Sequence, residues 1–172
     1  MIGQMPESNF LRIQLHHDHW ATAQIIDACR PLSGEQFHRR FDIGPGSLHD
    51  TLVHIVGAKR TWTDTLAQGD IRPRIEEDGQ RRTPDQIMEL WNQVHAAFAE
   101  QAFRCPADEM VSRVTRGGWS VQLTRAAVLT HVTTHGMHHR AQCLNMLRQL
   151  GVNPLPRNSV VEWVHVGEPL FE

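Results

Sequence analysis

The chain of 172 residues has no tyrosine, three cysteines and no large excess of either charge. Its 17 Lys and Arg residues against 19 Asp and Glu residues give a formal net charge of −2. No basic field therefore exists to attract nucleic acid or an anionic membrane surface. We expect the protein to bind neither.

Other absences concern compartment and membrane. Cys29, Cys105 and Cys143 are odd in number and have no CxxC spacing, which favours reduced thiols over a disulfide framework or a cysteine zinc site. The first 14 residues lack a basic region followed by an apolar one, so they do not resemble a secretory signal. No apolar run approaches the ~20 residues of a membrane span. Together these features predict a cytoplasmic protein.

Four segments have the apolar spacing of amphipathic helices. Ser47 follows Gly and Pro breakers and is a candidate N-cap, and Thr83 with Gln86 forms a capping-box pattern. The expected helices run from about Asn9 to Cys29, from Ser47 to just before Gly69, from Thr83 through Phe98, and from Ser120 or Leu123 to Gly151.

The connections between these helices are long. Residues 68–82 are polar and rich in breakers, and residues 104–120 are similar. Connections of this length are unusual unless they carry function or cover an opening. The pattern predicts an all-α protein, a four-helix bundle with long crossover connections, as one domain over 1–172. Its core spans about 9–151, and the tail 152–172 is either strand-like or one short helix.

Histidine is the abundant residue, with 12 in all, and four fall within "HVTTHGMHHRAQ" at 131–142. On a helical wheel His135 and His139 lie about 40° apart, inside the apolar stripe formed with Val128 and Met146. His131 and the fourth histidine of this motif lie at the margin of the apolar stripe. The (i, i+4) spacing lets two imidazoles converge on one ion.

His54 on the second helix faces the same way as Ile55 and Trp62, so it is expected to point inward as well. Three neutral imidazoles from two helices suit Zn²⁺ or a similar ion and leave a position open for water or substrate. The plainer alternative is a set of polar histidines at the edge of the core. "HHDH" at 16–19 is expected to be a solvated helix face.

Two motifs together resemble a known family. "GSLHDTLVHIVGAKRTW" with "HVTTHGMHHRAQCLNMLRQLG" is similar to the DinB-like four-helix-bundle superfamily, which includes bacillithiol and mycothiol S-transferases and thiol-dependent maleylpyruvate isomerases. The similarity extends from Trp20 to Gly151 and the prolines that follow. By motif position it implies that His54, His135 and His139 are the metal ligands.

The sequence departs from the motif at one position, because "HRAQ" has alanine where the family usually has glycine. The resemblance implies a divalent metal ion, with Zn first and Ni, Mn or Fe as alternatives. It also implies a low-molecular-weight thiol cosubstrate, a small-molecule substrate and a homodimer. Gln142 is a candidate for a supporting role beside the ligands, and Arg140 is expected to form a salt bridge with another helix.

The implied activity is that of a metal-dependent thiol S-transferase. No Asp or Glu is placed by the sequence as a general base. Two alternatives stay open: a metal-dependent hydrolase of a small substrate, and a non-catalytic metal-binding stress-response module.

Overall fold

The computed structural model describes residues 7–104, 106–115 and 117–167, with side chains from Phe10 onward. Nearly all of the secondary structure in this part of the chain is helical. The four long helices are α1 (Glu7–Cys29), α3 (Leu48–Leu66), α4 (Pro84–Arg104) and α5 (Arg125–Gln149). The shorter elements are α2 (Gly34–His38), the 3-10 turn η1 (Ile75–Glu77), strands β1 (Met110–Val114) and β2 (Ser120–Thr124), and α6 (Val160–His165).

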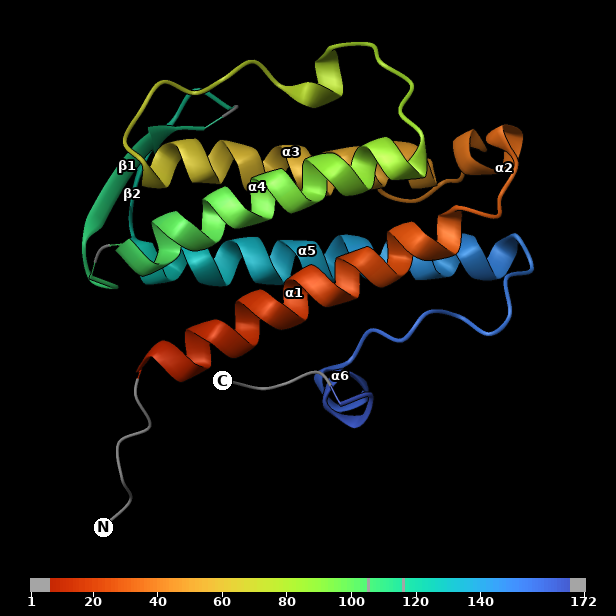
Figure 1. Ribbon diagram of the computed structural model, residues 1–172. Coiled ribbons are helices and arrows are strands. Elements are labelled where there is room, and N and C mark those ends of the chain that lie inside the picture. The colour runs from red at the N-terminus through yellow and green to blue at the C-terminus, as the bar shows by residue number, and fades with distance from the viewer. Residues whose placement is uncertain (1–6, 105, 116, 168–172) are drawn as a thin grey trace.

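The long helices form a bundle in which each helix packs against two others (Figure 1). Helix α3 packs on α4 and α5, and α1 packs on the same two helices. Figure 1 shows α3 and α4 running in the same direction, so the loop of residues 67–83 must return along the length of the bundle between them. The expected all-α bundle with a long crossover is confirmed.

Local capping explains where two of the helices begin. The Ser47 hydroxyl accepts a hydrogen bond from the backbone N–H of Asp50 at 3.0 Å. Thr83 and Gln86 form reciprocal side-chain to backbone bonds at 2.9 and 3.3 Å. Each cap satisfies donors that the first helical turn leaves free. Both predicted helix starts are therefore confirmed.

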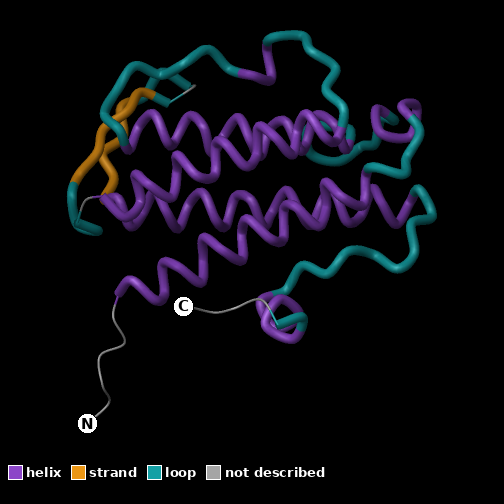
Figure 2. Tube along the Cα trace, in the orientation of Figure 1, coloured by secondary structure: helices purple, strands orange, loops and turns teal. Residues whose placement is uncertain are grey.

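The fourth long helix begins later than the sequence predicted. Residues 120–124 form strand β2, which pairs antiparallel with β1 (Figure 2). The Thr124 hydroxyl then caps α5 by accepting from the Ala127 N–H at 3.2 Å. The predicted start at Ser120 or Leu123 is wrong, because these residues alternate between the bundle and solvent, as strand residues do.

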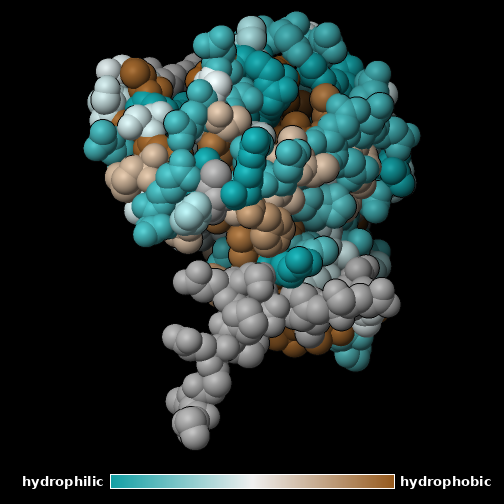
Figure 3. Space-filling model, turned by 60° about the vertical axis from the view of Figure 1, so that its left-hand side comes forward, coloured by the Kyte–Doolittle hydropathy of each residue, from teal (hydrophilic) through white to brown (hydrophobic). Residues whose placement is uncertain are grey.

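The hairpin covers one end of the bundle with its inner face. Val111 is buried, whereas Met110, Val114 and Trp119 are exposed. Figure 3 turns this end of the molecule toward the viewer, and its hydrophobic surface is broken into small patches among hydrophilic residues. Among the described helices, none has the length and apolar character that crossing a bilayer requires.

The tail resolves into a short helix rather than a strand. In α6 Ser159 and Glu162 form a capping box, and Trp163 is buried at 2% exposure. His17 Nε2 lies 3.0 Å from the Asn158 carbonyl oxygen, which ties the segment to α1. The tail therefore packs on the bundle, and residues 168–172 lie outside the described part.

A group of charged side chains is buried between the helices. Asp18 is 2% exposed, with its carboxylate oxygens 2.5 Å from Lys59 Nζ and 2.5 Å from Arg140 Nη1. The predicted salt bridge of Arg140 with another helix is confirmed. The expectation of a solvated face at 16–19 is wrong for Asp18, which shares the inward face of α1 with Leu15 and Thr22.

Candidate metal centre

Three imidazoles converge between α3 and α5. His54 comes from α3, and His135 and His139 lie one turn apart on α5. The Nε2 atom of His135 is 3.2 Å from Nε2 of His54 and 3.2 Å from Nε2 of His139. One nitrogen from each ring lies within 4.8 Å of the others, so this group can hold a metal ion.

The spacing of these nitrogens suits a small divalent ion. Imidazole nitrogens bind Zn²⁺ at about 2.0–2.1 Å, which puts two ligands of a tetrahedral ion about 3.3 Å apart. The two observed separations of 3.2 Å are close to that value. Three nitrogen donors without a carboxylate among them also match the chemistry of zinc and nickel better than that of calcium or magnesium.

The protonation state of the rings favours metal binding as well. Burial, followed by the neighbouring His139 and His54, lowers the pKa of His135 to about 3. Burial is also the main cause that lowers the pKa of His139. A histidine binds a metal in its neutral form, so neither of these rings has to lose a proton near neutral pH.

Hydrogen bonds orient two of the three rings. His54 Nδ1 lies 3.3 Å from Glu76 Oε1, and His139 Nδ1 lies 2.8 Å from Gln142 Oε1. An oxygen acceptor at Nδ1 places the proton there and leaves the lone pair of Nε2 free for a ligand bond. The structure thus puts Gln142 beside the group, where the sequence suggested a supporting role.

Two glycines let these acceptors approach closely. A Cβ atom at Gly57 on α3 would lie 2.2 Å from Glu76 Oε2. A Cβ atom at Gly44, whose φ is +51°, would lie 2.1 Å from Gln142 Oε1. Neither contact is possible for a larger residue unless the acceptor moves, so both glycines are part of how the imidazoles are positioned.

Glu76 is the functional candidate that sequence reasoning missed. It comes from η1, within the polar crossover, whose length suggested that it either carries function or covers an opening. Burial would raise its pKa, but hydrogen bonds from His54 and Arg74 more than offset burial and hold it at about 2. Arg74 Nη2 lies 2.8 Å from Glu76 Oε1. The loop's length was a signal, but no local pattern distinguishes this acid from the others in the loop.

Other histidine, cysteine and tryptophan side chains lie outside the group of three convergent histidines. His131 packs edge-on against Trp62, with ring centroids 5.1 Å apart. Cys143 is fully buried in the core, and burial raises the pKa of its thiol well above the ordinary value. Trp91 is also fully buried in the core. Cys105 lies outside the described residues.

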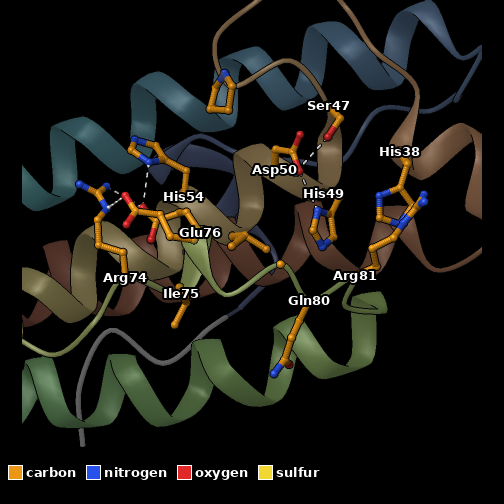
Figure 4. Close-up of a pocket in the computed structure, with 14 residues that line it drawn as sticks. His38, Ser47, His49, Asp50, His54, Arg74, Ile75, Glu76, Gln80 and Arg81 are labelled. Carbon is orange, nitrogen blue, oxygen red and sulfur yellow. Dashed lines mark hydrogen bonds and ion pairs between the residues drawn. The ribbon is translucent and has the colours of Figure 1, made fainter.

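A pocket of about 560 Å³ adjoins the centre (Figure 4). His54, Arg74 and Glu76 line one end, and His38 with Arg81 lines the other. Its volume is within the range of small-molecule sites, about 300–1,000 Å³. Of the three convergent histidines, His54 is the one that lines this pocket.

The chain is similar to known proteins in sequence and in fold. The protein named Protein DinB from Bacillus subtilis (strain 168) is 23% identical over 149 residues, covering 80% of this chain and 84% of that protein. The crystal structure of a DinB-like protein from Bacillus cereus ATCC 10987 has a TM-score of 0.64 at 18% identity, covering 83% of this chain and 91% of that chain.

This second likeness concerns the fold alone. The model of the DinB family matches residues 5–164, which is nearly the whole chain and includes all three convergent histidines. The resemblance read from the two helical motifs is thereby confirmed, and the chain belongs to the DinB family.

Proposed function

We propose that His54, His135 and His139 bind a divalent metal ion, with Zn²⁺ first and Ni, Mn or Fe as alternatives, and that the protein is a thiol S-transferase. The observation that carries the proposal is that His135 Nε2 lies 3.2 Å from the Nε2 atom of each of the other two rings. Glu76 and Gln142 orient those two rings.

When bound, such an ion would stabilise the thiolate form of a low-molecular-weight thiol, the stronger nucleophile, at neutral pH. The residues of the chain have other tasks. Glu76 and Gln142 accept the Nδ1 protons and fix the ring orientations. The adjoining pocket gives a small molecule room beside His54.

The reaction class comes from the resemblance to thiol-dependent relatives. In the transfer, the thiol sulfur forms a bond to an electrophilic carbon. With a chlorinated acceptor the carbon–chlorine bond breaks, chloride departs with its electron pair, and the thiol proton passes to water. The overall substitution reaction requires no oxidant or reductant.

Metal content is the first test. Protein purified without an affinity tag is expected to carry close to one metal ion per chain, and the His54→Ala and His139→Ala variants are expected to carry almost none. His16→Ala is the matched control because His16 is an exposed histidine on α1. Undiminished metal in both site variants would refute the centre.

The second test is turnover with chlorobimane and a panel of thiols. Fluorescent conjugate that depends on both thiol and metal supports transfer. Hydrolysis of model esters with no need for thiol would replace transfer by a metal-dependent hydrolase. Stoichiometric metal with neither reaction would leave a metal-binding module without catalysis.

The proposal carries further expectations about setting and partners. Cys29 and Cys143 are free thiols, which is consistent with the reducing cytoplasm, where low-molecular-weight thiols are abundant. The partner is a small molecule, and a net charge of −2 argues against nucleic acid. A homodimer is expected from the family and is measured by light scattering on a sizing column.

A further inference from the structure

The pocket that adjoins the metal centre through His54 has a second end, which is lined by different residues. Figure 4 shows His38 and Arg81 next to each other, across the pocket from His54 and Glu76. The two ends are joined along α3, because His49 and His54 both line the pocket. Five helical residues correspond to a rise of about 7.5 Å, so the pocket favours an elongated ligand.

The acidic side chains that line the pocket already have cationic partners. Asp50 Oδ2 lies 2.6 Å from Arg40 Nη1. Glu76 and Glu77 both pair with Arg74, at 2.8 and 3.7 Å. These pairs balance most of the negative charge in the lining, so the acids do not exclude an anionic ligand from it.

Arg81 differs from Arg74, the other arginine of the lining. Within the described part of the chain it has no hydrogen bond and no ion pair, and its side chain is exposed. A guanidinium presents donors in a fork that matches a carboxylate in two parallel hydrogen bonds. Arg81 is therefore a cation whose anionic partner is not supplied by the described residues.

The two histidines at this end of the pocket, His38 and His49, do not replace Arg81 as the cation. His49 Nδ1 is 2.9 Å from Asp50 Oδ1, and its Nε2 accepts the backbone N–H of Arg82 at 3.1 Å, so both ring nitrogens are engaged. Burial, followed by His49 and then Arg81, lowers the pKa of His38. The positive charge at this end of the pocket resides on Arg81.

We propose that this pocket selects a thiol carrying a carboxylate, which Arg81 holds while the sulfur lies at the three-histidine end. The inference rests on the proposed function and adds the class of thiol to it. A carboxylate group alone would be held weakly, since an ion pair at an exposed site improves affinity by about fivefold at most and salt screens it. The thiol end supplies the remaining affinity.

The test compares thiols that differ only at the far end. Terminal mercaptoalkanoates of three, six and eight carbons are paired with mercaptoalkanols of the same lengths. Dissociation constants are measured by calorimetry on the zinc-loaded protein at low ionic strength. We expect the carboxylate to improve binding by about three- to fivefold in the longer pairs, and not in the three-carbon pair, which cannot reach Arg81.

Variants assign that preference to one residue. Arg81→Gln is expected to abolish the preference for the carboxylate while leaving the affinity for the alcohols unchanged. Arg81→Lys, which keeps the charge, is expected to retain part of it. The matched control is Arg148→Gln, an exposed arginine in the last turn of α5, and it should behave as the parent protein.

The outcomes separate this inference from the proposed function. Equal binding of acids and alcohols at every length, or a preference that survives in Arg81→Gln, overturns the role of Arg81 and leaves thiol transfer standing. Failure to load zinc, nickel, manganese or iron, or failure of every thiol to bind the loaded protein, removes the proposed function, and the inference falls with it.

Discussion

Glu76 Oε1 lies 3.3 Å from His54 Nδ1, although the two residues are 22 positions apart in the chain. One belongs to helix α3 and the other to the crossover that leads to α4. The crossover therefore does more than return the chain along the bundle. It supplies the carboxylate that fixes the ring orientation of His54, one of the three convergent imidazoles.

The Glu76→Gln substitution tests this positioning role. The amide is nearly the same size but removes the charge that strengthens the hydrogen bond to His54. Loss of such a partner typically lowers metal affinity about 10- to 100-fold. Competition with a zinc chelator measures the effect, and Glu100→Gln, an exposed acid on α4, is the control. Equal affinity in both variants would show that Glu76 does not act on the centre.

Gly57→Ala tests the same contact from the other side. The added methyl group would lie 2.2 Å from Glu76 Oε2 and must displace the carboxylate. We expect metal affinity to fall by a factor similar to that of Glu76→Gln, with helix content kept in circular dichroism. Gly69→Ala is the control, since a Cβ atom there meets nothing within 4 Å. An unchanged metal affinity in Gly57→Ala would mean that the approach of Glu76 is unimportant.

The buried Asp18 is expected to govern stability rather than metal binding. Replacing it with alanine leaves Lys59 and Arg140 without their shared anion, and breaking a buried pair costs about 3–5 kcal/mol. Urea unfolding near neutral pH measures the free energy of unfolding. Asp70→Ala, an exposed acid in the crossover, should change it little. A cost near zero for Asp18→Ala would contradict the structural role.

Acid unfolding gives the same group a second test. Burial would raise the pKa of Asp18, but Lys59 and Arg140 hold it at about 2, below the ordinary 3.8. The stabilisation is therefore present above pH 3.8 and is lost as the pH falls toward 2. The parent protein should lose more stability across this window than an Asp18→Asn variant, and parallel curves would argue against the pair.

A structural feature could be predicted from the sequence when the contacts that determine it lie close together in the chain. The starts of α3 and α4 were predictable, because Ser47 and Thr83 act on backbone groups within three residues. The pair His135 and His139 was predictable for the same reason, since (i, i+4) spacing on one helix decides their common face. His54 required only the inward face of a second amphipathic helix.

The rest depended on contacts distant in the chain. Asp18 is buried because Lys59 and Arg140 reach it from two other helices, and no local pattern records that meeting. Glu76 approaches His54 because a loop folds back over Gly57. The hairpin was missed because its strands have only five residues each, and their pairing is a contact between two segments that no local pattern records.

The central claim is that His54, His135 and His139 bind one metal ion. Crystallography of the zinc-loaded protein with anomalous scattering tests this claim most directly. We predict one strong anomalous peak about 2.0–2.1 Å from Nε2 of each ring. A map in which the three rings only hydrogen-bond to one another, with the anomalous peak elsewhere or absent, would contradict this claim.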